Sequence, residues 1–186
     1  MKILLLKPIS DVYYVIQPNL GLGYLASIME KKHHEVQILD SGKESLTWGR
    51  FSDIVKHGKF DIIGIQMFTH ELLSAKKHIG IIKEVSPDTA IIVGGAHVSG
   101  DPAGTMNFIR NLDFGFVGEA EIGMEKFLEL KKKDYTNPDL LKKIPNLVWR
   151  DNDKVEINKK ECYEQLDVIK FPAWHLMKPS EYPVAP

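Results

Sequence analysis

The chain has 186 residues, of which 44% are hydrophobic and 26% are charged, and its formal net charge is −1. This composition is typical of a globular protein with one domain and an appendage, and the balanced charge argues against a nucleic-acid-binding protein, which usually has a basic excess. The single cysteine, Cys162, excludes an internal disulfide and an iron–sulfur cluster held by this chain alone.

Five short apolar runs alternate with five helical patterns. The first run is too short for a signal peptide, and no later run approaches the roughly 20 apolar residues of a membrane helix, so we expect a cytoplasmic protein without a membrane span. The expected strands are residues 3–6, 36–39, 62–65, 90–93 and 114–117, and the expected helices are residues 21–32, 46–56, 72–85, 102–111 and 121–133. This alternation predicts an α/β fold, with a flavodoxin-like (Rossmann-like) doubly wound five-stranded parallel sheet of order 2-1-3-4-5.

The alternation stops after Asp134. Residues 146–150 and 155–158 flank a polar turn, which predicts a β-hairpin. Prolines recur after Asp167, which is typical of an extended linker and not of a core element. The expected organisation is a main domain over residues 1–134, a hairpin appendage over 135–166 and a linker over 167–186. Because no closing element precedes Pro186, we interpret the chain as a piece of a longer protein.

Ligands of open parallel sheets bind at the carboxyl ends of the strands, so the loops there are candidate sites. The loop after the first strand, residues 8–19, is much longer than the roughly two to six residues of most such loops. Its apolar side chains either cover a ligand or pack on the domain's own helices. In the loop after the third strand, Thr69 and Glu71 offer a hydroxyl and a carboxylate, although Thr69 could simply be a helix cap.

The loops after the fourth and fifth strands carry glycines and acids. Gly94 and Gly95 would let another group approach the backbone closely, although they could also form a tight turn. In the fifth loop, Glu121 fits an ordinary role beside a positive helix terminus. Glu119 is therefore the better candidate for a hydrogen bond to a ligand.

Four sequence patterns at these strand ends resemble those of one family. They are Lys7-Pro8, then Pro18-Asn19-Leu20-Gly21-Leu22-Gly23-Tyr24-Leu25-Ala26, then Gly94-Gly95-Ala96-His97-Val98-Ser99, and finally Val117-Gly118-Glu119-Ala120-Glu121. In this order they resemble the N-terminal cobalamin-binding domain of cobalamin-dependent radical S-adenosylmethionine (SAM) enzymes. The subgroup of the anaerobic magnesium-protoporphyrin IX monomethyl ester oxidative cyclase is the most similar.

The resemblance implies cobalamin with its nucleotide tail buried beside Gly94 and Gly95. Thr69 and Ser99 would hydrogen-bond the tail or the corrin amides, and residues 118–119 would line the far side. The implied cofactor-binding residues are Pro8, Tyr13, Tyr14, Pro18, Gly21, Leu22, Thr69, Glu71, Gly94, Gly95, His97, Val98, Ser99, Val117, Gly118 and Glu119. No catalytic residue and no protein ligand to the metal are implied.

The first loop would lie under the corrin ring, with Tyr13 and Tyr14 shielding its lower face. Many cobalamin enzymes place a histidine ligand in an Asp-x-His-x-x-Gly motif after the first strand, but residues 8–19 contain no histidine. The resemblance therefore implies base-off cobalamin without a histidine ligand.

The resemblance also implies a larger parent enzyme, either a methyltransferase or a tetrapyrrole ring cyclase. A radical SAM domain of the same full-length chain would hold a [4Fe-4S] cluster and S-adenosylmethionine, so this fragment alone would not be catalytic. Ile9, Val98 and Ala120 depart from the family pattern, in which proline, proline and glycine are common at the three positions. These departures would slightly reshape the fourth and fifth loops and so change their exact ligand contacts.

Other cofactors are possible on the same fold. Residues 21–26 match the G-x-G-x-x-G/A form, and Asp40 ends the second strand, as in a dinucleotide-binding site. The long first loop argues against that reading, because the fingerprint glycines must form the turn directly after the first strand. A receiver module would need acids where Lys7-Pro8 and Gln66 stand. A nucleotide- or flavin-binding module of an oxidoreductase remains the alternative.

Overall fold

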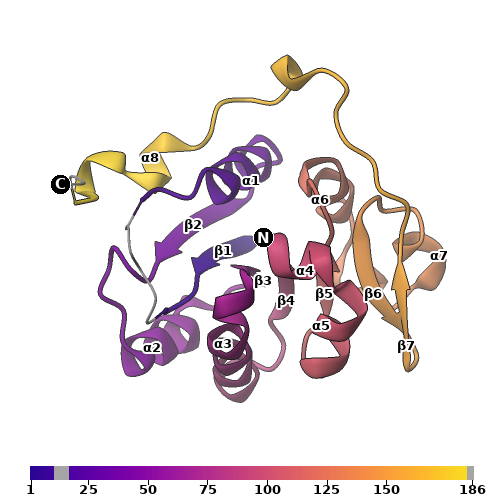
Figure 1. Cartoon of the computed structure of the whole chain (residues 1–186), viewed down its shortest axis with the longest axis horizontal. Helices are drawn as coiled ribbons and strands as arrows, with labels where there is room; N and C mark the ends of the chain where they lie inside the picture. Colours follow the sequence, from indigo (N-terminus) through magenta and orange to yellow (C-terminus); the bar gives the residue numbers. More distant parts are fainter. Residues whose placement is uncertain (11–16, 184–186) are drawn as a thin grey trace.

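One seven-stranded sheet runs through the computed structural model, which describes residues 1–10 and 17–183 (Figure 1). The strands are β1 (Lys2–Lys7), β2 (Glu35–Asp40), β3 (Ile62–Gln66), β4 (Ala90–Gly94), β5 (Phe114–Phe116), β6 (Leu147–Asp151) and β7 (Lys154–Ile157). Their order is β2-β1-β3-β4-β5-β6-β7, and the first five are parallel. The predicted flavodoxin-like order 2-1-3-4-5 is therefore confirmed.

Helices cover both faces of this sheet. They are α1 (Leu20–Lys31), α2 (Trp48–Gly58), α3 (Leu72–Val85), α4 (Ala96–Gly100), α5 (Pro102–Phe108), α6 (Glu121–Phe127), α7 (Pro138–Leu141) and α8 (Trp174–Met177). In Figure 1, α1 and α6 lie on one side of the sheet and α2, α3 and α5 on the other. None of the described helices has both the length and the apolar composition needed to cross a membrane.

The side chains of β1 pack into two separate hydrophobic cores, one on each face of the sheet. Ile3 and Leu5 pack with α1 and α6, whereas Leu4 and Leu6 pack with α2, α3 and α5. Side chains of a strand alternate between its faces, so a strand covered by helices on both sides must be apolar throughout. This requirement explains why an uninterrupted apolar run identified the strand.

Two helices are shorter than predicted, and three, α4, α7 and α8, were not predicted. The helix expected over residues 121–133 ends at Phe127, and the chain then turns so that Tyr135 stacks on Phe127 with ring centroids 5.0 Å apart. The helix expected to reach residue 111 ends at Phe108, because the chain turns there and buries Ile109. Of the unpredicted helices, α4 occupies the loop after β4.

The predicted hairpin forms from β6 and β7, and it extends the sheet. β6 pairs antiparallel with β5, and β7 pairs antiparallel with β6. Trp149 of β6 is buried in the core under α6 and α7. The hairpin thus packs on the same core as the strands before it.

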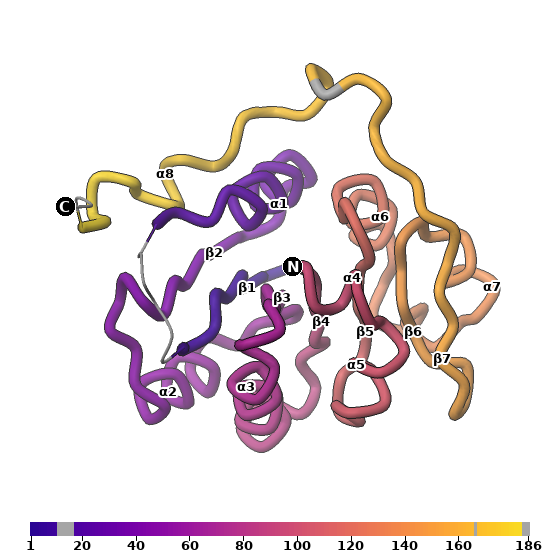
Figure 2. Tube along the Cα trace, in the orientation of Figure 1, coloured from indigo at the N-terminus to yellow at the C-terminus, as the bar shows by residue number. Residues whose placement is uncertain are grey.

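The expectation that the C-terminal segment has no core role is wrong. The segment runs from the hairpin to the side of α1 (Figure 2), where Ala173 and Met177 are buried. The Ala173 N–H donates to the Gly23 carbonyl at 3.0 Å, and a Cβ on Gly23 would lie 2.2 Å from the Met177 sulfur. Ala173 and Met177 are four residues apart, so they share one face of a short helix, which single prolines nearby had obscured.

Candidate functional site

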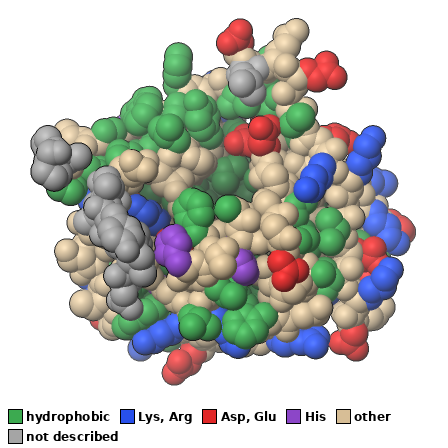
Figure 3. Space-filling view, viewed as in Figure 1, with side chains coloured by type: hydrophobic (Ala, Val, Ile, Leu, Met, Phe, Trp, Pro, Cys, Tyr) green, Lys and Arg blue, Asp and Glu red, His purple; other side chains and the backbone are tan. Residues whose placement is uncertain are grey.

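A cleft of about 340 Å³ opens between α1 and α6 at the carboxyl edge of the sheet. Its floor is formed by side chains or backbone of β1, β3, β4 and β5. The chain passes from β1 to β2 on one side and to β3 on the other, so the cleft lies beside the switch in strand order, where ligands of such sheets bind. In Figure 3, hydrophobic and acidic side chains border a hollow in this face.

The cleft brings together six of the residues proposed from the sequence and others that were not proposed. The six are Gly21, Leu22, Gly94, Gly95, Gly118 and Glu119. The other lining residues are Leu5, Asn19, Leu25, Gly64, Ile65, Gln66, Phe68, Ile92, Val93, Phe116, Ala120, Glu121 and Met124. Gln66 is the last residue of β3 and Phe68 follows two residues later, and this position at a strand end is the one sequence signal that could have identified them.

Glycines shape this cleft in two different ways. A Cβ added to Gly94 or to Gly118 would meet no atom within 4 Å, so both positions leave space beside the backbone. Gly95 has φ +108°, and its Cβ would lie 2.8 Å from the Met67 carbonyl oxygen. Gly94 thus leaves room for a ligand, whereas Gly95 is required first by the protein's own backbone.

Two acidic residues lie at the start of α6. Both Glu119 and Glu121 line the cleft. The Oε2 atom of Glu121 is buried and has no hydrogen-bond partner among the described residues. Burial raises the pKa of Glu121, and the nearby Glu119 carboxylate raises it further. A buried carboxyl oxygen without a partner is costly, so Glu121 is a strong candidate for a hydrogen bond with a ligand, and the sequence interpretation had set it behind Glu119.

The proposed hydroxyl groups lie behind the rim of the cleft. Ser99 Oγ donates to the Gly95 carbonyl at 2.9 Å and accepts from the Gly118 N–H at 2.9 Å, so it ties the fourth loop to the fifth. Thr69 Oγ1 lies 3.2 Å from His97 Nδ1. Neither hydroxyl lines the cleft itself, and both positions remain candidates for contacts outside it.

Glu71 is buried, and its carboxylate accepts a hydrogen bond from the backbone. Its carboxylate accepts from the Phe68 N–H at 2.9 Å, and burial raises its pKa. Phe68 occupies the cap position before the 3₁₀ turn over Thr69–Glu71, and Thr69 is the first residue of the turn and not its cap. Because Glu71 is only 1% exposed, its role in this structure is to hold the loop.

The remaining proposed residues lie around the cleft. Val98 and Val117 belong to the core on the other face of the sheet, so their side chains support the loops from beneath. Pro8 is buried after β1, and Pro18 is half-buried before α1. Tyr13 and Tyr14 lie outside the described residues.

Asp40 is engaged by the protein itself. It accepts from Lys7 Nζ at 3.2 Å and from the Tyr182 hydroxyl at 2.8 Å, and it also accepts from the Gly42 N–H. The first residue of α1 is Leu20, so Gly21 does not form the turn directly after β1. Both features differ from a dinucleotide-binding site, in which an acid at this position faces the ribose.

The chain is similar to known proteins over most of its length. A family model described as a B12 binding domain matches residues 6–128. The chain is 31% identical over 188 residues to an uncharacterized methyltransferase of Pyrococcus horikoshii, covering 98% of this chain and 40% of that protein. It is 26% identical over 225 residues to the cytidylyl-2-hydroxyethylphosphonate methyltransferase of Streptomyces wedmorensis, covering 97% of this chain and 41% of that protein. The chain thus spans about two fifths of the length of these relatives.

Solved structures share the fold. The cobalamin-dependent S-adenosylmethionine radical enzyme OxsB, with aqua-cobalamin and S-adenosylmethionine bound, superposes with a TM-score of 0.77 at 19% identity, over 97% of this chain and 25% of that one. The radical S-adenosylmethionine methyltransferase TsrM from Kitasatospora setae, with cobalamin and a [4Fe-4S] cluster bound, gives a TM-score of 0.71 at 14% identity, over 88% of this chain and 30% of that one.

Proposed function

Because the chain belongs to the B12-binding domain family, we propose that it binds cobalamin, with the nucleotide tail in the cleft between α1 and α6. The observation that carries the proposal is the space beside the backbone at Gly94 and Gly118, where any Cβ would occupy the cleft. The walls around this space are largely apolar, as a buried aromatic base requires, and a few polar groups fix orientation.

The polar groups of the cleft fit the cofactor as well. Glu121 offers a buried oxygen that has no partner within the described part of the chain, and Glu119 also lines the cleft. The hydroxyl groups and amides of cobalamin can donate hydrogen bonds to such oxygens. Bound cobalamin would supply a redox-active cobalt centre, while these residues orient the tail and exclude water from it.

We propose that the cofactor is base-off and has no histidine ligand. The first loop contains no histidine, and neither His70 nor His97 lines the cleft. Axial ligation tunes the redox behaviour of a bound metal, so an open lower face would favour the low coordination numbers of reduced cobalt.

We further propose that the chain is the N-terminal module of a larger cobalamin-dependent radical SAM enzyme. The relatives are more than twice as long as this chain, and both are named as methyltransferases. These names favour methyl transfer over ring cyclisation as the parent reaction. The [4Fe-4S] cluster and S-adenosylmethionine would be bound by another domain of the parent, since this chain has one exposed cysteine.

Reconstitution tests the binding proposal. The purified chain is mixed separately with hydroxocobalamin, FMN and NADH and then desalted. We expect equimolar retention of the corrinoid, with the absorption spectrum of the base-off form, and loss of the other two cofactors. A chain that retains FMN or NADH and releases the corrinoid would contradict the proposal and support the alternative of an oxidoreductase module.

A further inference from the structure

An exposed aromatic ring lies at the mouth of the cleft. Phe68 is 43% exposed, and among the exposed large hydrophobic residues that the structure describes it is the only one that lines the cleft. A large apolar side chain left in solvent at a ligand site is a surface that a ligand would cover. Phe68 follows β3, the middle strand of the five parallel ones, so its ring lies near the centre of this edge.

Hydrogen bonds fix the backbone at Phe68, and one stacking contact orients its ring. The Phe68 N–H donates to the buried Glu71 carboxylate at 2.9 Å, and the preceding residue, Met67, donates its N–H to the Gly94 carbonyl at 2.8 Å. The Phe68 ring stacks on His70 with a centroid distance of 5.8 Å and an interplanar angle of 6°. The loop is thus fixed before any ligand binds, which lowers the entropy cost of binding.

The stacked pair has one member inside the cleft and one outside it. Phe68 lines the cleft, whereas His70 does not, and His70 Nε2 lies 4.0 Å from the Glu71 carboxylate. A cleft of about 340 Å³ suits the tail of cobalamin, and the much larger corrin ring must remain at the mouth. Resting on the proposed function, we propose that Phe68 packs against the lower face of the corrin ring and keeps His70 from reaching the cobalt.

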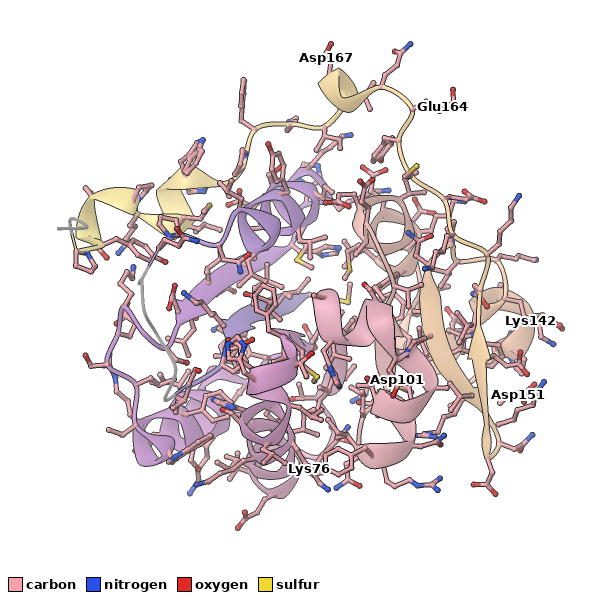
Figure 4. The ribbon with its side chains drawn as sticks, in the orientation of Figure 1. Lys76, Asp101, Lys142, Asp151, Glu164 and Asp167 are labelled. Atoms are coloured by element: carbon pink, nitrogen blue, oxygen red, sulfur yellow. The ribbon has the colours of Figure 1, made fainter. Side chains whose placement is uncertain are left out.

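The first test compares affinities for hydroxocobalamin by isothermal titration. Phe68→Ala should weaken binding about tenfold, as expected for truncating an aromatic contact, and Phe68→Leu should recover part of the loss. The matched control is Phe108→Ala, because Phe108 is 44% exposed but lines no part of the cleft. The Phe108 ring instead makes a cation–π contact with Lys76 Nζ, which lies 3.9 Å from the ring centroid on the α3 side of the molecule (Lys76 is labelled in Figure 4). Phe108→Ala should bind with unchanged affinity.

The second test is electron paramagnetic resonance of the cob(II)alamin form. The unaltered chain should show no axial nitrogen splitting, whereas Phe68→Ala should show it, and Phe68→Ala combined with His70→Ala should lose it again. A Phe68→Ala variant whose affinity or cobalt spectrum matches that of the unaltered chain would overturn this inference alone. Failure of the unaltered chain to bind any corrinoid would instead refute the proposed function.

Discussion

Gly94→Val should weaken the binding of hydroxocobalamin at least about 100-fold, which corresponds to about 2.7 kcal/mol. A Cβ at this position meets no protein atom within 4 Å, so the valine side chain would extend into the cleft and occupy the space proposed for the tail. The strand conformation of Gly94 accommodates a β-branched residue, so the thermal stability of the variant should stay close to that of the unaltered chain. Isothermal titration and thermal denaturation measure both quantities.

Two other glycines provide the controls for this experiment. Gly80→Val places the same side chain in open space on α3, away from the cleft, and should leave the affinity unchanged. Gly95→Val should unfold at a markedly lower temperature, because φ is +108° and its Cβ would clash with the Met67 carbonyl. If Gly94→Val is stable and binds corrinoid as the unaltered chain does, the tail does not occupy this cleft.

Acid should destabilise the fold through His78. This side chain is fully buried between the Trp48 and Phe51 rings, each with its centroid 4.6 Å away. Its Nδ1 lies 2.8 Å from the Ser74 carbonyl oxygen, and Nε2 has no hydrogen-bond partner among the described residues. Burial lowers the pKa of His78 from 6.5 to about 4. The imidazole is therefore neutral in the folded protein at neutral pH.

The sign and size of the effect follow from proton binding. Between pH 6.5 and about 4 the unfolded chain binds a proton at His78 and the folded chain does not, so the free energy of unfolding falls as the pH falls. The full loss is about 3 kcal/mol for this group. Urea denaturation at pH 7 and pH 4.5 measures most of this loss. His78→Phe should remove most of the loss of unfolding free energy that His78 causes between pH 7 and pH 4.5. His57→Gln, at an exposed histidine, should leave that loss unchanged. Equal pH dependence in the unaltered chain and both variants would contradict the argument.

The central fold was predictable because burial on two faces demands apolar strands. The run of leucines in β1 and the isoleucine-rich β3 and β4 show this requirement, and the helices between them are long enough to show a period. The end of α6 was not predictable, because Tyr135 reaches Phe127 only after the chain has turned. The docking of Met177 on Gly23 was also hidden, since it joins segments far apart in the sequence.

The candidate site was predictable in its location but only partly in its residues. Parallel strands all end at one edge, so the glycines at the carboxyl ends of β4 and β5 were identified from the sequence alone. Their different roles were not, because the positive φ of Gly95 and the open space at Gly94 depend on how α4 and Met67 pack. Phe68 was not proposed and Glu121 was ranked behind Glu119 for a related reason. The exposure of Phe68, and the lack of a partner for Glu121 among the residues that the structure describes, are properties of the folded chain.

The most direct test of the account is a map of backbone amide signals during titration with methylcobalamin, a diamagnetic form of the cofactor. ¹⁵N–¹H correlation spectra report each amide separately. We expect the largest shift changes at Leu22, Gly94 and Gly118, which line the cleft, and the smallest at Gly49 and Gly80 on the opposite face. Bound cofactor with its largest changes on the α2–α3 face, and none at Gly94 or Gly118, would contradict the placement of cobalamin between α1 and α6.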